Sequence, residues 1–133
     1  MNYVLLTVEQ VVAIHDHVLD DNELQGMAGG KYLDGALSRV ENRLNYGLVE
    51  DVFALAASYA AAVSQAHCFN DGNKRTAFQV MDLVLDLHGV PMVWDTEAVG
   101  QKIIALAQSN LDEADFADWL RREAKNVMER TKK

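Results

Sequence analysis

The stretch VFALAASYAAAV, from Val52 to Val63, decides the fold class, because Ser58 is its only polar residue. A helix that is apolar all round belongs in the middle of a bundle, where other helices cover every face. We therefore expect a central helix from Asp51 to His67. A second central helix is predicted from Asn73 to Leu87, since its apolar residues recur on one side and Gly89 stands just past its end.

Four further helices are predicted around this pair. The first begins with Thr7-Val8-Glu9-Gln10, a capping-box pattern in which the threonine hydroxyl and the glutamine side chain satisfy free amides at a helix start. Apolar residues at three- and four-residue steps indicate the others. The expected ranges are Thr7–Leu19, Leu33 to near Gly47, Asp95 or Thr96 to about Gln108, and Asp112 through Phe116, Leu120 and Met128.

Three segments are expected to be irregular. The longest runs from Asp20 to Gly30, where several glycines stand among polar residues and favour an exposed loop or small hairpin. Pro91–Trp94 is predicted to be a short extended piece. Arg130–Lys133 is expected to be a solvated, frayed tail.

The composition favours packed helices in one domain. The chain has 133 residues, half of them apolar, with one proline and eight glycines. This length is near the commonest size of a single domain, and so few chain breakers argue against a sheet sandwich. We predict an all-α, single-domain helical bundle over residues 1–133, with a basic C-terminal tail at 123–133.

The charge balance limits the possible partners. Twenty acidic and twelve basic residues give a formal charge of -8, which repels nucleic acids and anionic membranes. Any bound anion must be captured locally, which singles out Lys74 and Arg75. The single cysteine, Cys68, allows no internal disulfide, and we find no signal peptide and no apolar run near the roughly 20 residues of a membrane span. A cytoplasmic protein without a nucleic-acid or membrane partner is expected.

The segment between the two central helices carries three ingredients of phosphate chemistry. His67 could accept a proton from an attacking hydroxyl, because its unperturbed pKa lies near physiological pH. Asp71 could hold Mg²⁺, which usually takes only one or two protein carboxylates. Gly72–Arg75 lies where a helix begins, so free amides and two cationic side chains could bind an anion.

Each ingredient also has an ordinary structural interpretation. A histidine at the end of a buried helix, an Asp-Gly turn and a solvated Lys-Arg pair are all common. Phe69 is interpreted as a core residue that pins the loop, so that His67 and Asp71 face the same side. Spacing alone leaves both interpretations open.

The run from His67 to Ala77, HCFNDGNKRTA, resembles the HxFxDGNKRTA signature of the Fic/Doc superfamily, specifically the Doc ("death on curing") toxins of toxin–antitoxin modules. Gly30–Leu37 with Arg39 resembles the family's upstream helix, and Leu87–Val90 resembles its downstream helix end. The resemblance covers most of residues 7–122. It implies the family's small all-α fold.

The resemblance also implies an activity. Fic members with glycine at the position of Lys74 transfer AMP from ATP, whereas Doc members carry lysine there and transfer the γ-phosphate. By analogy, this chain would be a protein Ser/Thr kinase and type II toxin that uses ATP and Mg²⁺ to phosphorylate a threonine of elongation factor Tu and stop translation. A Phd-like antitoxin would inhibit it by binding a groove formed by exposed apolar positions on the first and final helices.

The family's functional residues carry over onto matching positions. His67 would be the base and Asp71 the Mg²⁺ ligand, while the loop from Asn22 to Gly30 would be the flap that docks the target. The phosphate-binding residues would be Gly72, Asn73, Lys74, Arg75 and, as a helix-start contact, Thr76.

Two departures keep alternatives open. Cys68 stands where the superfamily usually has proline, and Gln65 stands where some Doc toxins have a basic residue. We interpret Cys68 as a small buried hydrophobe and expect Gln65 to leave one phosphate or target contact missing. An AMP transferase and a non-catalytic antitoxin-binding co-repressor remain alternatives to the kinase.

Other residues invite a structural interpretation. His15 and His17 flank Asp16, but residues two apart point to different helix faces, so a surface position is favoured over a metal site. Asp82 and Asp86 are expected on a solvated face. Trp94 and Trp119 are expected to anchor the core between the last elements.

Overall fold

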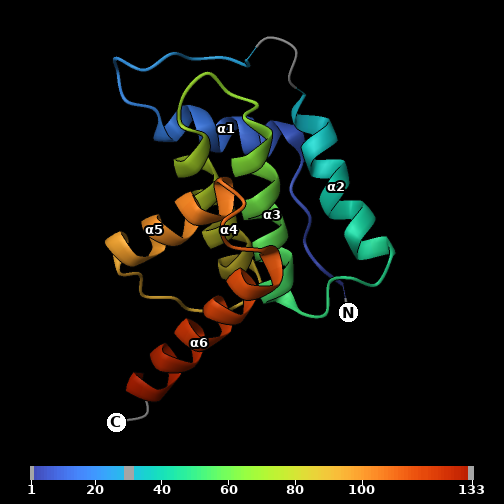
Figure 1. The fold of residues 1–133 in the computed structure, drawn as a ribbon, viewed down its shortest axis with the longest axis vertical. Coiled ribbons are helices and arrows are strands. Elements are labelled where there is room, and N and C mark those ends of the chain that lie inside the picture. The colour runs from blue at the N-terminus through green and yellow to red at the C-terminus, as the bar shows by residue number, and fades with distance from the viewer. Residues whose placement is uncertain (1, 29–31, 132–133) are drawn as a thin grey trace.

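Helix α3, Val52–Ala66, runs through the middle of the bundle, as its apolar sequence predicts (Figure 1). The computed structural model describes residues 2–28 and 32–131. The side chains from Leu55 to Ser64 are all buried. Helix α4, Asn73–Leu87, packs along α3, and its bounds are those expected from the sequence.

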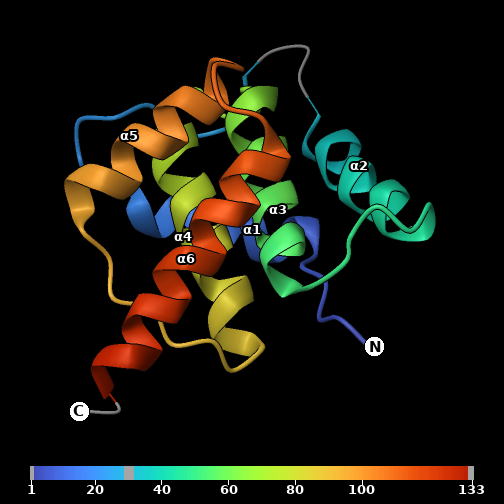
Figure 2. The same cartoon turned by 60° about the horizontal axis from the view of Figure 1, so that its bottom comes forward.

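The other helices cover this pair. Helix α1, Val8–Val18, crosses α4, and α2, Leu33–Asn45, lies against the outer side of α3 (Figures 1 and 2). Helix α5, Thr96–Ala107, packs against α3 and α4. The all-α prediction is confirmed, and no helix in the described part of the chain is both long and apolar enough to cross a membrane.

The last helix, α6, spans Glu113–Thr131 and crosses α3 before its end projects from the bundle (Figure 2). Phe116 and Leu120 are buried, as predicted, but Val127 rather than Met128 continues the buried face. Arg130 is exposed, as predicted for a solvated tail, but the prediction of fraying was wrong for Arg130 and Thr131, because the helix includes both. A cation such as Arg130 suits the negative end of the helix dipole. Lys132 and Lys133 lie outside the described residues.

The helix ends follow the capping chemistry in the sequence. At α1, the Thr7 side chain accepts from Gln10 N–H and the Gln10 side chain accepts from Thr7 N–H, which is the predicted capping box. Asp51 caps α3 and Asp95 caps α5 through their side chains. The α4 N-terminus differs, because its cap residue is Gly72, which has no side chain to offer.

The two tryptophans pack where the sequence placed them. The rings of Trp94 and Trp119 stack with centroids 6.2 Å apart, and the Trp94 indole donates to Asp82 Oδ1 at 2.9 Å. Asp82 is thus half-buried and bonded, which corrects the expectation of a solvated face, while Asp86 is exposed. The indole needed a polar partner once it was packed against the core.

Candidate active site

The connection between α3 and α4 is bracketed by two residues in the left-handed backbone region. His67 ends α3 with φ 50° and ψ 44°, and Gly72 begins α4 with φ 80°. Phe69, between them, is 3% exposed, as expected for a core residue that pins the loop. Because the chain reverses so tightly, the exposed His67 and the first turn of α4 border one cavity.

Asn73 closes the loop from inside. Its side-chain oxygen accepts from Phe69 N–H at 3.1 Å, and its amide donates to Phe69 O at 2.9 Å. Asn73 was predicted to contact phosphate, but these two hydrogen bonds to Phe69 were not predicted. They occupy the side chain and leave the backbone N–H of Asn73 as the group that could meet a phosphate.

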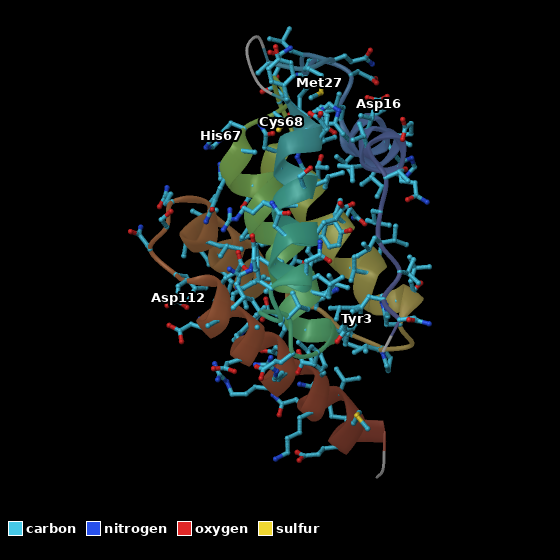
Figure 3. The ribbon with its side chains drawn as sticks, turned by 90° about the vertical axis from the view of Figure 1, so that its right-hand side faces the viewer. Tyr3, Asp16, Met27, His67, Cys68 and Asp112 are labelled. Carbon is cyan, nitrogen blue, oxygen red and sulfur yellow. The ribbon has the colours of Figure 1, made fainter. Side chains whose placement is uncertain are left out.

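The segment from Asp20 to Ala28 lies beside the loop, where the resemblance placed the flap. Ala28 N–H donates to Cys68 O at 2.8 Å, and Asn70 N–H donates to Gly26 O at 3.2 Å, which forms an isolated antiparallel bridge between Met27 and Phe69. Met27, Cys68 and His67 lie at the same end of the molecule (Figure 3). Gly29 and Gly30, also assigned to the flap, lie outside the described residues.

Asp71 is held by both neighbours of the loop. Its Oδ2 accepts from Leu24 N–H at 2.9 Å, and its backbone carbonyl accepts from His15 Nε2 at 2.7 Å. The Leu24 contact fixes the direction of the side chain. A single ordered carboxylate fits Mg²⁺, which takes few protein ligands and keeps water or phosphate oxygens. Among residues 2–28 and 32–131, no cluster of three or more metal-binding side chains occurs.

His15 was predicted at the surface, and this was wrong. The residue is 1% exposed, and its ring stacks on Phe69 with centroids 3.7 Å apart. The signal was available in the sequence, because His15 follows Val11 by four residues and therefore shares the buried face of α1. His17 is exposed, so the two histidines do point to different faces.

The loop cavity has a volume of about 330 Å³ and is lined by His67, Asn70, Asp71, Gly72, Asn73, Lys74 and Arg75. It contains the predicted base, the predicted metal ligand and the start of α4. With no side-chain cap, the first amides of α4 are available to an anion at the positive end of the helix dipole. The exposed ammonium of Lys74 adds a charge at the same place.

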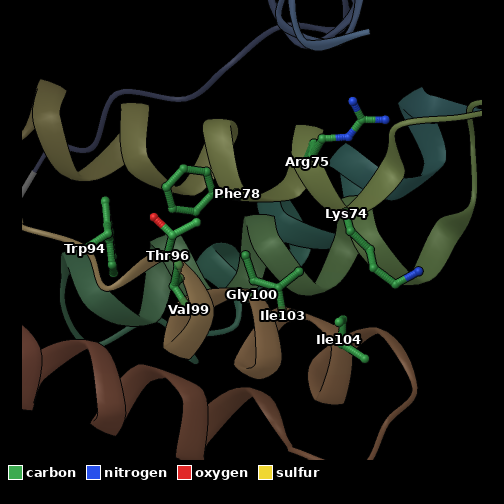
Figure 4. Close-up of a pocket in the computed structure, with 9 residues that line it drawn as sticks. All are labelled: Lys74, Arg75, Phe78, Trp94, Thr96, Val99, Gly100, Ile103 and Ile104. Carbon is green, nitrogen blue, oxygen red and sulfur yellow. The ribbon is translucent and has the colours of Figure 1, made fainter. Parts of the chain in front are cut away.

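Arg75 behaves differently from Lys74. Its guanidinium points to the opposite side of α4 (Figure 4), donates to Val18 O at 3.0 Å and pairs with Asp20 and Glu23. The Arg75 hydrogen bond lowers the pKa of the Glu23 carboxyl, and the same bond raises the pKa of Arg75. The predicted phosphate contact of Arg75 therefore requires its guanidinium to leave these carboxylates.

Thr76 lies away from the cavity. Its side chain is fully buried, and its hydroxyl has no hydrogen-bond partner among the described residues. Thr76 N–H donates to Gly72 O at 2.9 Å, so its backbone is used within the first turn of α4. Its contact with phosphate stays a prediction without geometric support.

A second cavity of about 270 Å³ opens beside the first, between α4 and α5 (Figure 4). Its walls are mainly apolar, and it shares Lys74 and Arg75 with the loop cavity; the other lining residues are Phe78, Trp94, Thr96, Val99, Gly100, Ile103 and Ile104. Sequence reasoning missed it, because its residues come from three segments that only folding brings together.

The two departures from the family signature have structural roles. Cys68 is 1% exposed, as expected for a small buried side chain. Gln65 accepts from Arg39 at 3.0 Å and donates to Leu106 O at 2.9 Å, so it joins α3 to α2 and α5. The structure therefore gives Gln65 a packing role.

Comparisons with known proteins give two matches. A family model described as "Fic/DOC family" matches residues 5–85. The chain is also similar to the protein named "Protein kinase doc" from Escherichia phage P1, with 31% identity over 118 residues, which cover 88% of this chain and 93% of the phage protein. The match runs through every element that builds the loop cavity.

Proposed function

We propose that this chain, which belongs to the Fic/DOC family, is a toxin that acts as a protein kinase. It would transfer the γ-phosphate of ATP to a threonine hydroxyl of elongation factor Tu in the cytoplasm and thereby stop translation. The name of the phage relative supports the kinase, and the cavity around His67 supplies the groups that this reaction needs.

His67 is the proposed general base. Its imidazole is exposed at the rim of the loop cavity, where a target hydroxyl can approach from solvent. The imidazole takes the hydroxyl proton as the oxygen forms a bond to the γ-phosphorus, and the bond from that phosphorus to the bridging oxygen breaks to release ADP. Such a transfer depends on positioning and charge neutralisation more than on covalent chemistry of the protein.

Asp71 is the proposed ligand of Mg²⁺, which would neutralise charge on the phosphate oxygens. Leu24 N–H and His15 hold Asp71 from either side of the loop, so its carboxylate is ordered before a nucleotide arrives. Such preorganisation lowers the cost of assembling a charged site.

The phosphates would meet Gly72, Asn73 and Lys74. Gly72 allows α1 to pack close to this loop, since a Cβ at this position would come within 3.1 Å of Leu19 Cδ2. The amides of Asn73 and Lys74 begin α4, and the Lys74 ammonium is exposed beside them. Arg75 would join from the flap side once it is released from Glu23.

A single observation carries the kinase proposal: Lys74 lines the loop cavity where α4 begins, at the position where Fic members that transfer AMP have glycine. The test is to incubate the purified protein with elongation factor Tu, Mg²⁺ and ATP labelled on the γ-phosphate. We expect label on the target and a phosphate-sized mass increase, both lost in His67→Ala. Mass increases of the size of AMP, without γ-label, would contradict the kinase.

The apolar cavity between α4 and α5 favours a second candidate, AMP transfer. If the adenine ring of ATP binds in this cavity, the α-phosphate lies closer to the loop than the γ-phosphate does, because the α-phosphate is attached to the nucleoside. A parallel reaction with ATP labelled on the α-phosphate separates the two candidates. Label from this ATP would reach the target only if AMP is transferred.

We also propose a Phd-like antitoxin as partner. The first and final helices do not form the expected groove together, because α1 and α6 are not in contact in the described chain. A cavity of about 300 Å³ between α1 and α4 supports a partner on the first helix; it is lined by Ala13, Ile14, His17, Val18, Gln79 and Leu83. Such a groove suits the apolar face of a partner helix.

Expression in cells should be toxic for the wild type and tolerated for His67→Ala, whereas equal tolerance would favour a non-catalytic module.

A further inference from the structure

His15 is buried beneath the active-site loop and belongs to another helix, 56 positions away from Asp71 in sequence. It lies against three residues of the loop. The ring stacks on Phe69 with an angle of 7° between planes, Nε2 donates to Asp71 O, and the ring edge faces Gly72. A buried polar side chain with these contacts can hold the loop in one conformation.

The hydrogen bond places a hydrogen on His15 Nε2 and sets the direction of one peptide group, while Nδ1 lies 3.3 Å from Asp16 Oδ1. A carbonyl can only accept, so His15 Nε2 must carry the hydrogen. The described chain has no cis peptide, and in a trans peptide the C=O and the following N–H point in opposite directions. Anchoring Asp71 C=O to His15 therefore turns Gly72 N–H away from α1.

Gly72 N–H then faces the side where phosphate is expected. Gly72 lines the loop cavity, and among residues 2–28 and 32–131 its N–H has no hydrogen-bond acceptor. The neighbouring carbonyl, by contrast, is removed from the cavity and satisfied. A carbonyl on the cavity side would repel an anion, so the orientation of this peptide affects how tightly the loop can bind a phosphate.

We infer that His15 is a positioning residue of the phosphate-binding loop: its Nε2–H holds the Asp71–Gly72 peptide so that the amide faces the phosphate and the carbonyl does not. The inference rests on the proposed function, because it assigns His15 to phosphate transfer. His15 does not touch the reacting groups and acts through Asp71 and Gly72.

Two variants separate the hydrogen bond from the packing. His15→Phe keeps an aromatic ring against Phe69 but removes the donor, whereas His15→Gln restores a donor at the position of Nε2. Because a misplaced site group costs on the order of 100-fold, we expect His15→Phe to lower kcat by about this factor. The KM for the protein target should stay within about twofold, because the target is expected to dock on the flap. His15→Gln should recover most of kcat.

The first readout does not depend on activity. Amide hydrogen exchange of residues 67–73, measured on the protein without nucleotide, should be faster in His15→Phe and close to wild type in His15→Gln. A second readout is ATP affinity by calorimetry in the His67→Ala background, where no turnover occurs; His15→Phe should weaken it. Glu9→Phe is the control, since Glu9 lies on the same helix and is exposed.

The outcomes distinguish this inference from the proposed function. If His15→Phe folds with unchanged loop exchange and ATP affinity, or with unchanged kcat, the positioning role is overturned. If His15→Phe does not fold, His15→Gln decides: wild-type loop exchange supports the role, and a folded variant with a loosened loop contradicts it. If the wild type transfers no phosphate, the proposed function fails, while loop exchange and ATP affinity still test His15.

Discussion

The guanidinium of Arg75 is held by the carboxylate of Glu23, a residue of the flap. Arg75 also donates to Val18 O, at the end of α1, so the arginine ties the start of α4 to both neighbouring segments. An anion that recruits Arg75 must compete with Glu23. The charge state of this flap residue therefore bears directly on phosphate binding.

Replacing Glu23 should release Arg75. We expect Glu23→Gln to bind ATP more tightly than the wild type, because a neutral amide competes less well for the guanidinium than a carboxylate. Calorimetry in the His67→Ala background measures the affinity without turnover. Glu41→Gln, at an exposed position on α2, is the control for the change in net charge, and equal affinities for both variants would exclude competition by Glu23.

The charge of Lys74 is expected to matter for transfer. Lys74→Met keeps most of the side-chain length beside the α4–α5 cavity but removes the cation. Loss of a charged contact to a transferred phosphate should lower kcat/KM for ATP by about 10- to 100-fold. Initial rates at varied ATP provide the measurement. Lys125→Met, exposed on α6, should leave the rate unchanged.

Asp71→Asn tests the metal ligand while preserving the loop. An asparagine oxygen can still accept from Leu24 N–H, so the fold should be retained. Without the carboxylate charge, we expect the Mg²⁺ concentration for half-maximal activity to rise by about tenfold or more. Magnesium titrations at fixed ATP would show this. An unchanged Mg²⁺ dependence would remove Asp71 from the metal site.

The contact between Asp51 and Arg121 should make stability depend on pH. Arg121 donates to both oxygens of Asp51 at 2.8 and 3.0 Å and lowers the pKa of this carboxyl below its ordinary 3.8. A lowered folded pKa means that the pair adds stability above about pH 3.8 and loses it as the pH falls through the lower value. Because the pair is partly exposed, we expect Asp51→Asn to lose only about 0.5–1 kcal/mol at pH 7.

Asparagine can still cap α3, so Asp51→Asn isolates the ion pair from the cap. Urea unfolding at pH 7 and at about pH 3 should show that the difference from wild type shrinks in acid. Asp86→Asn, at an exposed position of α4, provides the reference. A difference that is constant over this range would show that the charge of Asp51 is not responsible.

The buried hydroxyl of Tyr59 should stabilise the fold by binding the N-terminal segment. It accepts from Leu6 N–H at 2.9 Å, and burial raises the pKa of the phenol. Tyr59→Phe leaves a buried N–H without its acceptor, which typically costs about 1–3 kcal/mol. Urea unfolding measures the loss, and Tyr46→Phe at an 80% exposed position should be neutral.

The helices were predictable because each depends on neighbouring residues. The apolar run at 52–63, the capping box at Thr7 and the Asp51 and Asp95 caps act within one or two turns, and the structure has helices where they indicate them. The segment from His67 to Arg75 could likewise be singled out, because its polar groups lie within a few positions of one another.

The partners of that segment could not be predicted, because they come from distant parts of the chain. His15, Leu24 and Glu23 reach Asp71 and Arg75 only once α1 and the flap pack on the loop. The sequence by itself determined the helices and which loop carries the chemistry, since both are local. Only the tertiary structure decided that His15 lies beneath the loop and that Arg75 turns away from Lys74, because contacts with a loop and charge pairing depend on which distant segments meet.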